Sequence, residues 1–301
     1  MQHWMPKDRI FAKQRLTPYL FLLPALFLLG LTVFWPALQA FYLSFTEYTL
    51  IGQAPEWVGF KNFRRLWTDT VFWQTLWNTL LYLICVVPIL VVASLGLAIL
   101  VNQKLRGISW LRAAYYTPVV ISMVVAGIAW NWLYAENGLL NQVLVNTKII
   151  PFLQNGVPWL TSPRFALFSV MVVTVWKGLG YYMVIYLAGL QSIPADVYEA
   201  AAIDGSDGIA KHWDITIPLM KPYLVLVAVI SAISATKVFE EVYIMTQGGP
   251  RNSSKTIVYY LYEQAFQNLE MSYACTIGLV LFLAILGLSI LNLKLSNSIK
   301  N

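Results

Sequence analysis

Six long apolar runs, separated by more polar segments, dominate the pattern of this chain. A helix needs about 20 residues to cross the hydrocarbon core of a bilayer, and each run reaches that length. The predicted spans cover residues 18–45, 75–101, 111–135, 164–190, 223–246 and 273–292. The pattern therefore predicts an all-α integral membrane protein with six transmembrane helices, built as a single domain over residues 1–301. An even number of spans places both termini on the same side.

The first apolar run is too long for the core of a signal peptide, and no small-residue cleavage site follows it. We therefore expect it to remain attached as the first span. Residues 46–74 alternate aromatic and polar side chains, which predicts an interfacial loop with short helical pieces. Pro88, near the middle of the second span, predicts a kink.

Residues 191–222 form the longest connection that mixes acids, small residues and glycines. Pro194 suits the first turn of a helix, where its missing N–H needs no partner, and Gly205 has the backbone freedom that ends one. A second short helix is predicted over residues 209–216, and Pro218 and Pro222 close it before the next apolar run. Two short helices joined at a glycine elbow indicate a docking element. The alternative is an amphipathic connector that lies on the membrane surface.

Composition supports the membrane assignment. The chain is 58% apolar and 11% charged, with a mean hydropathy of +0.64. Cys85 and Cys275 both lie inside apolar runs, so we interpret them as buried small side chains and not as a disulfide or a metal pair. The net charge of +6 does not indicate nucleic acid as a partner, because loop charges in a membrane protein mainly report orientation.

Lysine and arginine are distributed unevenly between the two sets of loops. The termini, the loop around Lys104 and the segment 191–222 together hold eleven of them, whereas the other loops hold seven. Cytoplasmic loops carry the excess of positive charge in membrane proteins. We therefore expect the N- and C-termini and the segment 191–222 to be cytoplasmic.

Several kinds of catalytic chemistry are excluded by the motifs. No phosphate-binding loop of the form GxxxxGK[ST] occurs in the sequence, so the chain does not energise itself. The two histidines, His3 and His212, have no cysteine or histidine neighbour at ligand spacing, which argues against a catalytic metal. We expect a protein that is not an enzyme and has no cofactor of its own.

Lys177 lies near the middle of the fourth predicted span, and Lys237, Glu240 and Glu241 lie in the central to outer part of the fifth. A charge in hydrocarbon costs on the order of several kcal/mol unless it faces a partner or a wet cavity, so these side chains should point into the bundle. Lys237 and Glu241 are four residues apart and are able to pair on one helix face. One interpretation is an ion pair that only fixes packing, such as Lys177 with Glu240. The other is direct contact with a solute.

The segment 191–222 resembles the EAA loop of ABC importer permeases, which couples the membrane subunit to its ATPase. The residues that carry the resemblance are Glu199, Ala200, Ala201, Asp204, Gly205, Ile215, Pro218 and Pro222. His212 stands where that family usually has an aromatic residue, which affects the packing of the second helix. The resemblance implies that Glu199, Ala200, Ala201, Asp204, Gly205 and Pro218 contact the ATPase.

Longer stretches of the chain resemble carbohydrate-uptake ABC permeases. They are PYLFLLPALFLLGLTVFWPALQAFYLSF, WVGFKNFRRLWTDTVFW, WKGLGYYMVIYLAGLQSIP and FEEVYIMTQGGPRNSS. The resemblance implies a type I importer permease in a bacterial inner membrane. It implies a second homologous permease, two ATP-binding subunits that hold ATP and Mg²⁺, and an extracytoplasmic solute-binding protein as partners, with membrane lipid around them.

A sugar or sugar-like solute, as the resemblance implies, requires hydrogen-bonding groups and flat aromatic faces. The aromatic residues next to the intramembrane charges are candidates for the translocation path: Trp176, Tyr181, Tyr182, Phe239 and Tyr243. Together with Lys177, Lys237, Glu240 and Glu241 they form the predicted solute path. A secondary transporter and a membrane scaffold remain alternatives, and the intramembrane residues do not distinguish one sugar from another.

Overall fold

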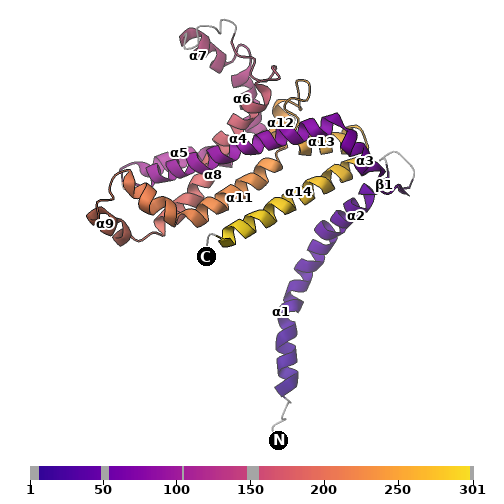
Figure 1. The fold of residues 1–301 in the computed structure, drawn as a ribbon, viewed down its shortest axis with the longest axis horizontal. Coiled ribbons are helices and arrows are strands. Elements are labelled where there is room, and N and C mark those ends of the chain that lie inside the picture. Colours follow the sequence, from indigo (N-terminus) through magenta and orange to yellow (C-terminus); the bar gives the residue numbers. More distant parts are fainter. Residues whose placement is uncertain (1–6, 49–53, 104, 148–155, 299–301) are drawn as a thin grey trace. The chain divides into compact units, whose positions relative to one another are not determined.

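A computed structural model describes residues 7–48, 54–103, 105–147 and 156–298, and most of them are helical (Figure 1). The chain divides into two compact units. The first consists of residues 1–67 and 264–279, and the second of residues 68–263 and 280–301. Each unit is described by itself.

The first unit begins with an apolar helical run. α1 (Lys7–Leu29), the π-helix η1 (Gly30–Phe34) and α2 (Trp35–Ser44) follow one another directly. The stretch Pro18–Ser44 of this run is long and apolar enough to cross a membrane. The most apolar part of this stretch is not buried within the chain. The π-helix lies just before Pro36, where the amide of Trp35 reaches back five residues to the carbonyl of Gly30. The surface of this run is thus available to lipid or to another protein.

A short antiparallel pair of strands follows in the same unit. β1 (Thr46–Glu47) pairs with β2 (Glu56–Trp57), and α3 (Lys61–Thr68) comes next. Asn62 joins these pieces, because its Nδ2 donates to the carbonyls of Ser44 at 3.1 Å and Thr46 at 2.8 Å. The interfacial segment therefore contains the predicted helical piece and, in addition, a two-stranded sheet that the alternation of aromatic and polar residues did not indicate.

Two long helices form the centre of the second unit. α4 (Thr70–Val101) begins at Asp69, whose Oδ1 accepts hydrogen bonds from the amides of the first turn at 2.9 and 3.2 Å. α8 (Ala166–Gln191) packs along α4, and Gly178 allows close approach because a Cβ at this position would lie 3.0 Å from Leu90 Cδ2. These two helices position most of the buried core.

The third predicted span, residues 111–135, is not one continuous helix. α5 (Ile108–Val120) ends at an extended Ile121, and α6 (Met123–Tyr134) and α7 (Leu139–Thr147) follow. The stretch Met123–Thr147, which contains α6 and α7, is bent by 99° relative to α5. Pro118 lies in the last turn of α5, and Ser122 starts α6 by accepting a hydrogen bond from the amide of Val125 at 3.4 Å. The third predicted span therefore contains a break, and its bounds remain a prediction.

The fifth predicted span, residues 223–246, is also interrupted. α11 (Lys221–Thr236) ends at Lys237, and α12 (Glu240–Met245) begins after Phe239. Because this break separates Lys237 from Glu241, the two residues do not share one helix face. The prediction of an i, i+4 pair between them is wrong, since such a pair requires a helix without interruption.

The C-terminal part contains α13 (Ile257–Tyr262), the π-helix η3 (Glu263–Gln267) and α14 (Met271–Ser298). In the described part of the chain, three helices are long and apolar enough to cross a membrane, or up to five if each of two bent pairs counts as one span. A further apolar stretch, Met271–Gly287, is shorter. The boundaries of the six spans remain predictions.

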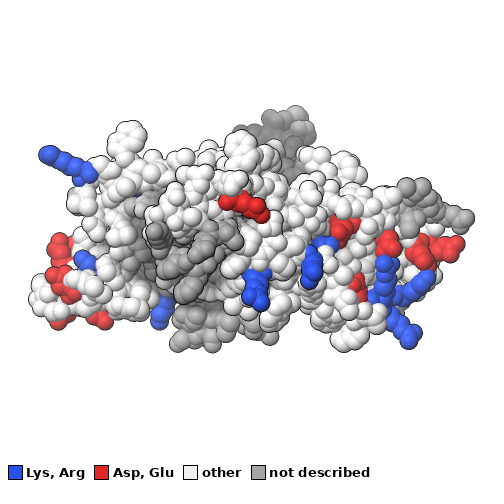
Figure 2. Space-filling view, turned by 90° about the horizontal axis from the view of Figure 1, so that it is seen from above, with Lys and Arg blue, Asp and Glu red and all other residues white. Residues whose placement is uncertain are grey.

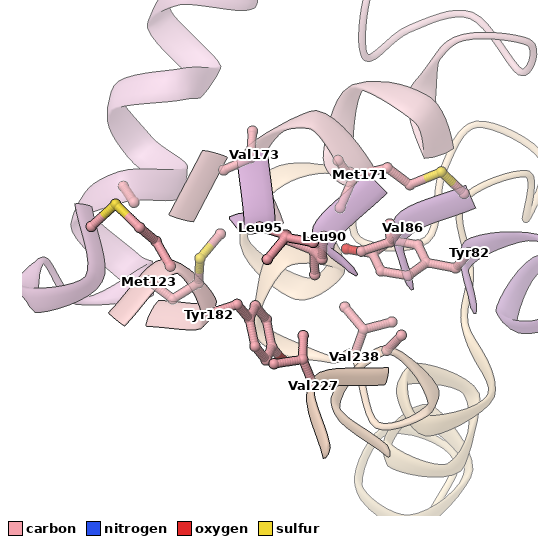
Figure 3. Close-up of a cluster of buried hydrophobic side chains, with 14 of the residues drawn as sticks. Tyr82, Val86, Leu90, Leu95, Met123, Met171, Val173, Tyr182, Val227 and Val238 are labelled. Atoms are coloured by element: carbon pink, nitrogen blue, oxygen red, sulfur yellow. The ribbon is translucent and has the colours of Figure 1, made fainter. Parts of the chain in front are cut away.

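The core of the second unit lies where α4, α6, α8 and α11 meet. Figure 3 shows side chains from these helices and from the segment after α11 pointing toward one another. The labelled residues are Tyr82, Val86, Leu90, Leu95, Met123, Met171, Val173, Tyr182, Val227 and Val238. All of them are less than a tenth exposed, which buries apolar surface between the helices. A cavity with a mixed apolar and polar lining lies beside this core.

Candidate functional site

A cavity of about 320 Å³ lies between α4, α8, α11 and α12. Its polar lining combines hydroxyl groups with one lysine and one glutamate. The polar and aromatic lining residues are Tyr82, Thr174, Lys177, Tyr181, Tyr182, Ser231, Ser234 and Glu241. Four of the predicted path residues therefore meet here: Lys177, Tyr181, Tyr182 and Glu241.

Lys177 binds the broken end of α5. Its Nζ donates to the carbonyl of Pro118 at 3.2 Å, to that of Val119 at 3.2 Å and to that of Ile121 at 2.5 Å. These carbonyls lack the helical partners that a continuous helix would provide, and they lie at the negative end of the α5 dipole. The lysine ammonium therefore compensates the backbone at the 99° bend.

Glu241 faces the same cavity from α12. Its Oε1 accepts a hydrogen bond from Thr174 Oγ1 at 3.4 Å, and the Thr174 hydroxyl also contacts the hydroxyl of Tyr82. These groups come from three different helices, so the cavity wall depends on how α4, α8 and α12 pack together.

The ion pair predicted between Lys177 and Glu240 is not present, because Lys177 donates to backbone carbonyls and Glu240 is exposed. Lys237 is exposed as well. Within the described residues, the ion pairs are Lys61 with Glu47, Arg65 with Glu270, and Lys255 with Glu263. The prediction failed because the helix breaks turn these side chains away from the positions that continuous helices would give them.

The other predicted path residues are not part of the cavity lining. Trp176 packs edge-on against Trp130, with ring centroids 5.5 Å apart. Phe239 and Tyr243 are stacked at 5.4 Å, and both contact the ring of Tyr262. Their part in solute transfer remains a prediction.

Four hydroxyl groups of the cavity were not predicted from the sequence, those of Tyr82, Thr174, Ser231 and Ser234. The sequence feature that could have indicated these residues was the presence of polar side chains inside apolar runs. Small hydroxyl residues are common in membrane helices, however, where they often bond to their own backbone, as Ser231 Oγ does to the carbonyl of Val227 at 2.7 Å. Only the packing of the helices separates lining residues from the others.

The segment 191–222 contains the first predicted short helix and its glycine elbow. α9 (Ala195–Ile203) follows Pro194, and Gly205 has a φ of 87°, a left-handed conformation that favours glycine. The amide of Ser206 bonds to the carbonyl of Ala201 at 2.8 Å, which completes the C-terminal cap. Local residue types therefore determine this helix and its end.

The second short helix differs from the prediction. It contains the π-helix η2 (His212–Thr216) and continues as α10 (Ile217–Leu219), so Pro218 lies inside it and does not close it. Proline clashes with the carbonyl four residues before it in a regular α-helix. The wider π-turn, in which the amide of Ile217 bonds to the carbonyl of His212, accommodates the ring.

Thr216 joins the two halves of this segment. Its buried hydroxyl lies 3.2 Å from the Tyr198 hydroxyl and 3.1 Å from His212 Nδ1. Burial, and secondarily the charge of Lys211, lowers the pKa of His212 below 6.5. His212 is thus a partly buried polar residue bonded to Thr216, and its lowered pKa favours the neutral form.

The outer surface of the segment combines acids with apolar side chains. Glu199 and Ala200 are exposed, whereas Ala201 is only 6% exposed and packs within the segment. Three large apolar residues are highly exposed: Ile203 at 86%, Ile209 at 78% and Trp213 at 68%. Acidic side chains gather at the left end of the view in Figure 2, where Figure 1 places α9. Such a mixed surface is suited to binding another protein.

A comparison with known protein families identifies the family of this chain. Residues 70–296 match the family described as binding-protein-dependent transport system inner membrane component. The match covers most of the chain, and the chain belongs to this family. It is a membrane permease component of a transport system, which confirms the resemblance found in its sequence.

Relatives match nearly the whole chain. It is 33% identical over 271 residues to the sulfoquinovosyl glycerol transport system permease protein SmoG of Agrobacterium fabrum, covering 89% of this chain and 86% of that protein. It is 35% identical over 277 residues to the lactose transport system permease protein LacF of Rhizobium radiobacter, covering 91% of each chain. It is 36% identical over 299 residues to the arabinooligosaccharides transport system permease protein AraP of Bacillus subtilis, covering 97% of this chain and 92% of that protein.

The fold is similar to solved importer structures. A chain of a bacterial ABC transporter involved in the import of the acidic polysaccharide alginate superposes with a TM-score of 0.86 and 21% identity, covering 98% of this chain and all of that one. A second structure, of the bacterial alginate ABC transporter in complex with an alginate pentasaccharide-bound periplasmic protein, gives a TM-score of 0.81 and 22% identity, covering 95% of this chain and 96% of that one. The predicted all-α, type I importer permease fold is confirmed.

Proposed function

We propose that this chain forms half of the translocation path of an ATP-driven importer for a sugar or sugar-like solute. A second, homologous permease supplies the other half. Two separate ATP-binding subunits hold ATP and Mg²⁺, and an extracytoplasmic solute-binding protein delivers the solute. In this arrangement the chain lies in a bacterial inner membrane with both termini and the segment 191–222 in the cytoplasm, as its lysine and arginine distribution favours.

The observation that carries the proposal is the folded, exposed segment 191–222. Its two helical pieces are joined by the hydrogen bond between the hydroxyl groups of Tyr198 and Thr216. Its surface presents the carboxylate of Glu199 and the apolar side chains of Ile203 and Trp213 to the outside. A rigid element of this kind transmits the motion of a bound ATPase to the helices, provided that its contacts differ between two states.

Three features support a sugar-like solute. The relatives named above are permeases for sulfoquinovosyl glycerol, lactose and arabinooligosaccharides. The cavity is lined by hydroxyl groups, which exchange hydrogen bonds with a polyhydroxylated solute. Tyr181 and Tyr182 add aromatic rings at the same place, with centroids 5.1 Å apart.

The experiment that tests the proposal begins with purification of the tagged chain together with its bound subunits. The complex is reconstituted in proteoliposomes and screened for sugars that stimulate ATP hydrolysis and enter the vesicles. We expect an ATP-hydrolysing subunit to co-purify and at least one sugar to stimulate it. Recovery of the chain without such a subunit, or uptake that proceeds without ATP, contradicts the proposal.

Two variants test the coupling role of the segment. Gly205→Pro cannot adopt the φ of 87° found at the elbow, and Glu199→Lys reverses an exposed charge. Both are expected to insert normally and to reduce ATP-driven uptake at least about tenfold. Glu56→Lys, an equivalent reversal at an exposed residue of β2, is the control and should retain uptake. Normal uptake in both loop variants refutes the role.

A further inference from the structure

A second cavity, of about 360 Å³, lies where the segment 191–222 meets the ends of α4 and α8. Its described lining residues do not overlap with those of the cavity between α4, α8, α11 and α12. The polar part of the lining consists of Asn102, Gln103, Tyr198, Lys211, His212 and Thr216. These side chains come from stretches that are distant in the sequence, so the second cavity exists only in the folded unit.

Lys211 brings a full positive charge to this lining. Among the described residues, no carboxylate lines the second cavity and no ion pair includes Lys211. The acids closest to it in the sequence are exposed and bonded elsewhere. Asp207 accepts a hydrogen bond from the amide of Gly208 at 2.6 Å, and Asp214 accepts one from the hydroxyl of Ser206 at 2.6 Å. Water screens such exposed charges, so the ammonium is not balanced within the lining.

The end of α4 does not supply the missing negative charge. The last carbonyls of a helix carry a partial negative charge. At this end, however, the guanidinium of Arg112 donates to the carbonyl of Val101 from Nε at 3.0 Å and from Nη2 at 2.7 Å. Arg112 therefore compensates the end of α4 and places a second cation next to Asn102 of the lining.

The uncharged lining groups add hydrogen-bond donors. Within the part of the chain that the structure describes, the side-chain amides of Asn102 and Gln103 and the ammonium of Lys211 have no hydrogen-bond partner. Each amide has two N–H donors, and the ammonium has three. A carboxylate has only two oxygens, whereas a phosphate group offers at least three strong acceptors, which suits donors that come from different stretches of the chain.

We propose that the second cavity is a binding site for a phosphate group, in which Lys211 supplies the charge and Asn102 and Gln103 supply further donors. Two sources carry this group, inorganic phosphate and the headgroup of an anionic lipid. A phosphate held here bridges the end of α4 and the segment 191–222, which are separate parts of the chain. The inference goes beyond the proposed function, because it does not depend on the transported solute.

Protection of a thiol measures occupancy at this cavity alone. Cys85 and Cys275 are replaced by alanine, and Ile99→Cys places a thiol at an apolar position of the lining. The complex with its bound subunits is embedded in nanodiscs of phosphatidylcholine. Its reaction with N-ethylmaleimide is followed by mass spectrometry of this chain, so phosphate bound to an ATP-binding subunit does not enter the result.

We expect saturating inorganic phosphate to slow the reaction at least about tenfold relative to chloride at the same ionic strength, because the thiol reacts only in the empty cavity. Lys211→Met should remove this protection, and Lys211→Arg, which keeps the charge, should retain part of it. Lys221→Met is the matched control, since Lys221 is an exposed cation of the same segment that does not line the cavity. This control should keep the protection.

Nanodiscs that contain phosphatidylglycerol, without added phosphate, distinguish the two sources. Protection that depends on Lys211 in these nanodiscs supports the proposal and identifies a lipid headgroup as the ligand. Protection by inorganic phosphate alone supports it and identifies the free anion. The proposal is overturned if neither probe protects the thiol, if chloride protects it equally well, or if protection persists in Lys211→Met.

Discussion

The ion pair between Lys255 and Glu263 offers a sharp test of how this fold is stabilised. Lys255 Nζ lies 2.8 and 2.6 Å from the two carboxylate oxygens, and the side chains are only 8% and 22% exposed. The aliphatic part of Lys255 packs against Gly248, where a Cβ would come within 3.0 Å of its Cε. Little water therefore reaches the pair.

Replacement of Lys255 by methionine keeps the apolar stem and removes the charge. Glu263 is then left partly buried without its cation, which costs about 3–5 kcal/mol in buried pairs. Because Glu263 retains some exposure, we expect a loss near the lower value, about 3 kcal/mol. The double variant Lys255→Met, Glu263→Leu removes both charges and should recover most of the loss, since the stranded carboxylate is what destabilises the single variant.

The matched control is Lys61→Met. Its pair with Glu47 has a similar distance, 2.7 Å, but the side chains are 63% and 59% exposed, so the expected loss is at most about 1 kcal/mol. Unfolding of the detergent-solubilised protein in denaturant, followed by tryptophan fluorescence, measures the free energies. The reasoning is refuted if Lys255→Met loses no more stability than Lys61→Met, or if the double variant is as unstable as the single one.

Three further predictions concern other polar contacts. Lys177→Met removes three hydrogen bonds at the break of α5 and should lower the free energy of unfolding by about 2–3 kcal/mol. The same change at the exposed Lys237 is the control and should lower that free energy by about 0.5 kcal/mol or less. Asn141→Ala removes the acceptor of the Val157 amide (2.9 Å) and the Trp159 indole (3.0 Å), so proteolysis near residue 157 should accelerate. Because the pKa of His212 is lowered in the folded chain, the unfolded segment binds more protons just below pH 6.5, and segment 191–222 should lose stability as the pH falls through that range. Protease susceptibility at pH 7.5 and 5.5 tests this dependence, and it should be weaker in His212→Gln; an unchanged pH dependence in that variant contradicts it.

Features that depend on neighbouring residues could be predicted from the sequence. Apolar runs of sufficient length indicated membrane helices, since every residue of such a run must be compatible with hydrocarbon. Pro194 and Gly205 indicated where α9 begins and ends, because each acts through its own backbone dihedral angles. Pro218 was misjudged, because the π-turn that accommodates it involves the whole preceding turn.

The pairing of the intramembrane charges could not be predicted in this way. Lys177 was expected to face a carboxylate, but its partners are backbone carbonyls of a helix broken about 60 residues earlier in the chain. Nothing in the residues around Lys177 shows that α5 ends at that point. Likewise, Glu241 lines the cavity and its neighbour Glu240 does not, because the break after α11 sets the direction from which α12 enters.

The sequence by itself indicated a membrane permease with a segment of short helices between its fourth and fifth apolar runs. Only the tertiary structure decided where the helices break, which hydroxyl groups meet around the cavity, and which of the intramembrane charges line it. Hydrophobicity and backbone preference are properties of each residue and its near neighbours, and the sequence displays them directly. The partner of a buried charge lies on another helix, and its identity follows from packing between segments that are distant in the chain.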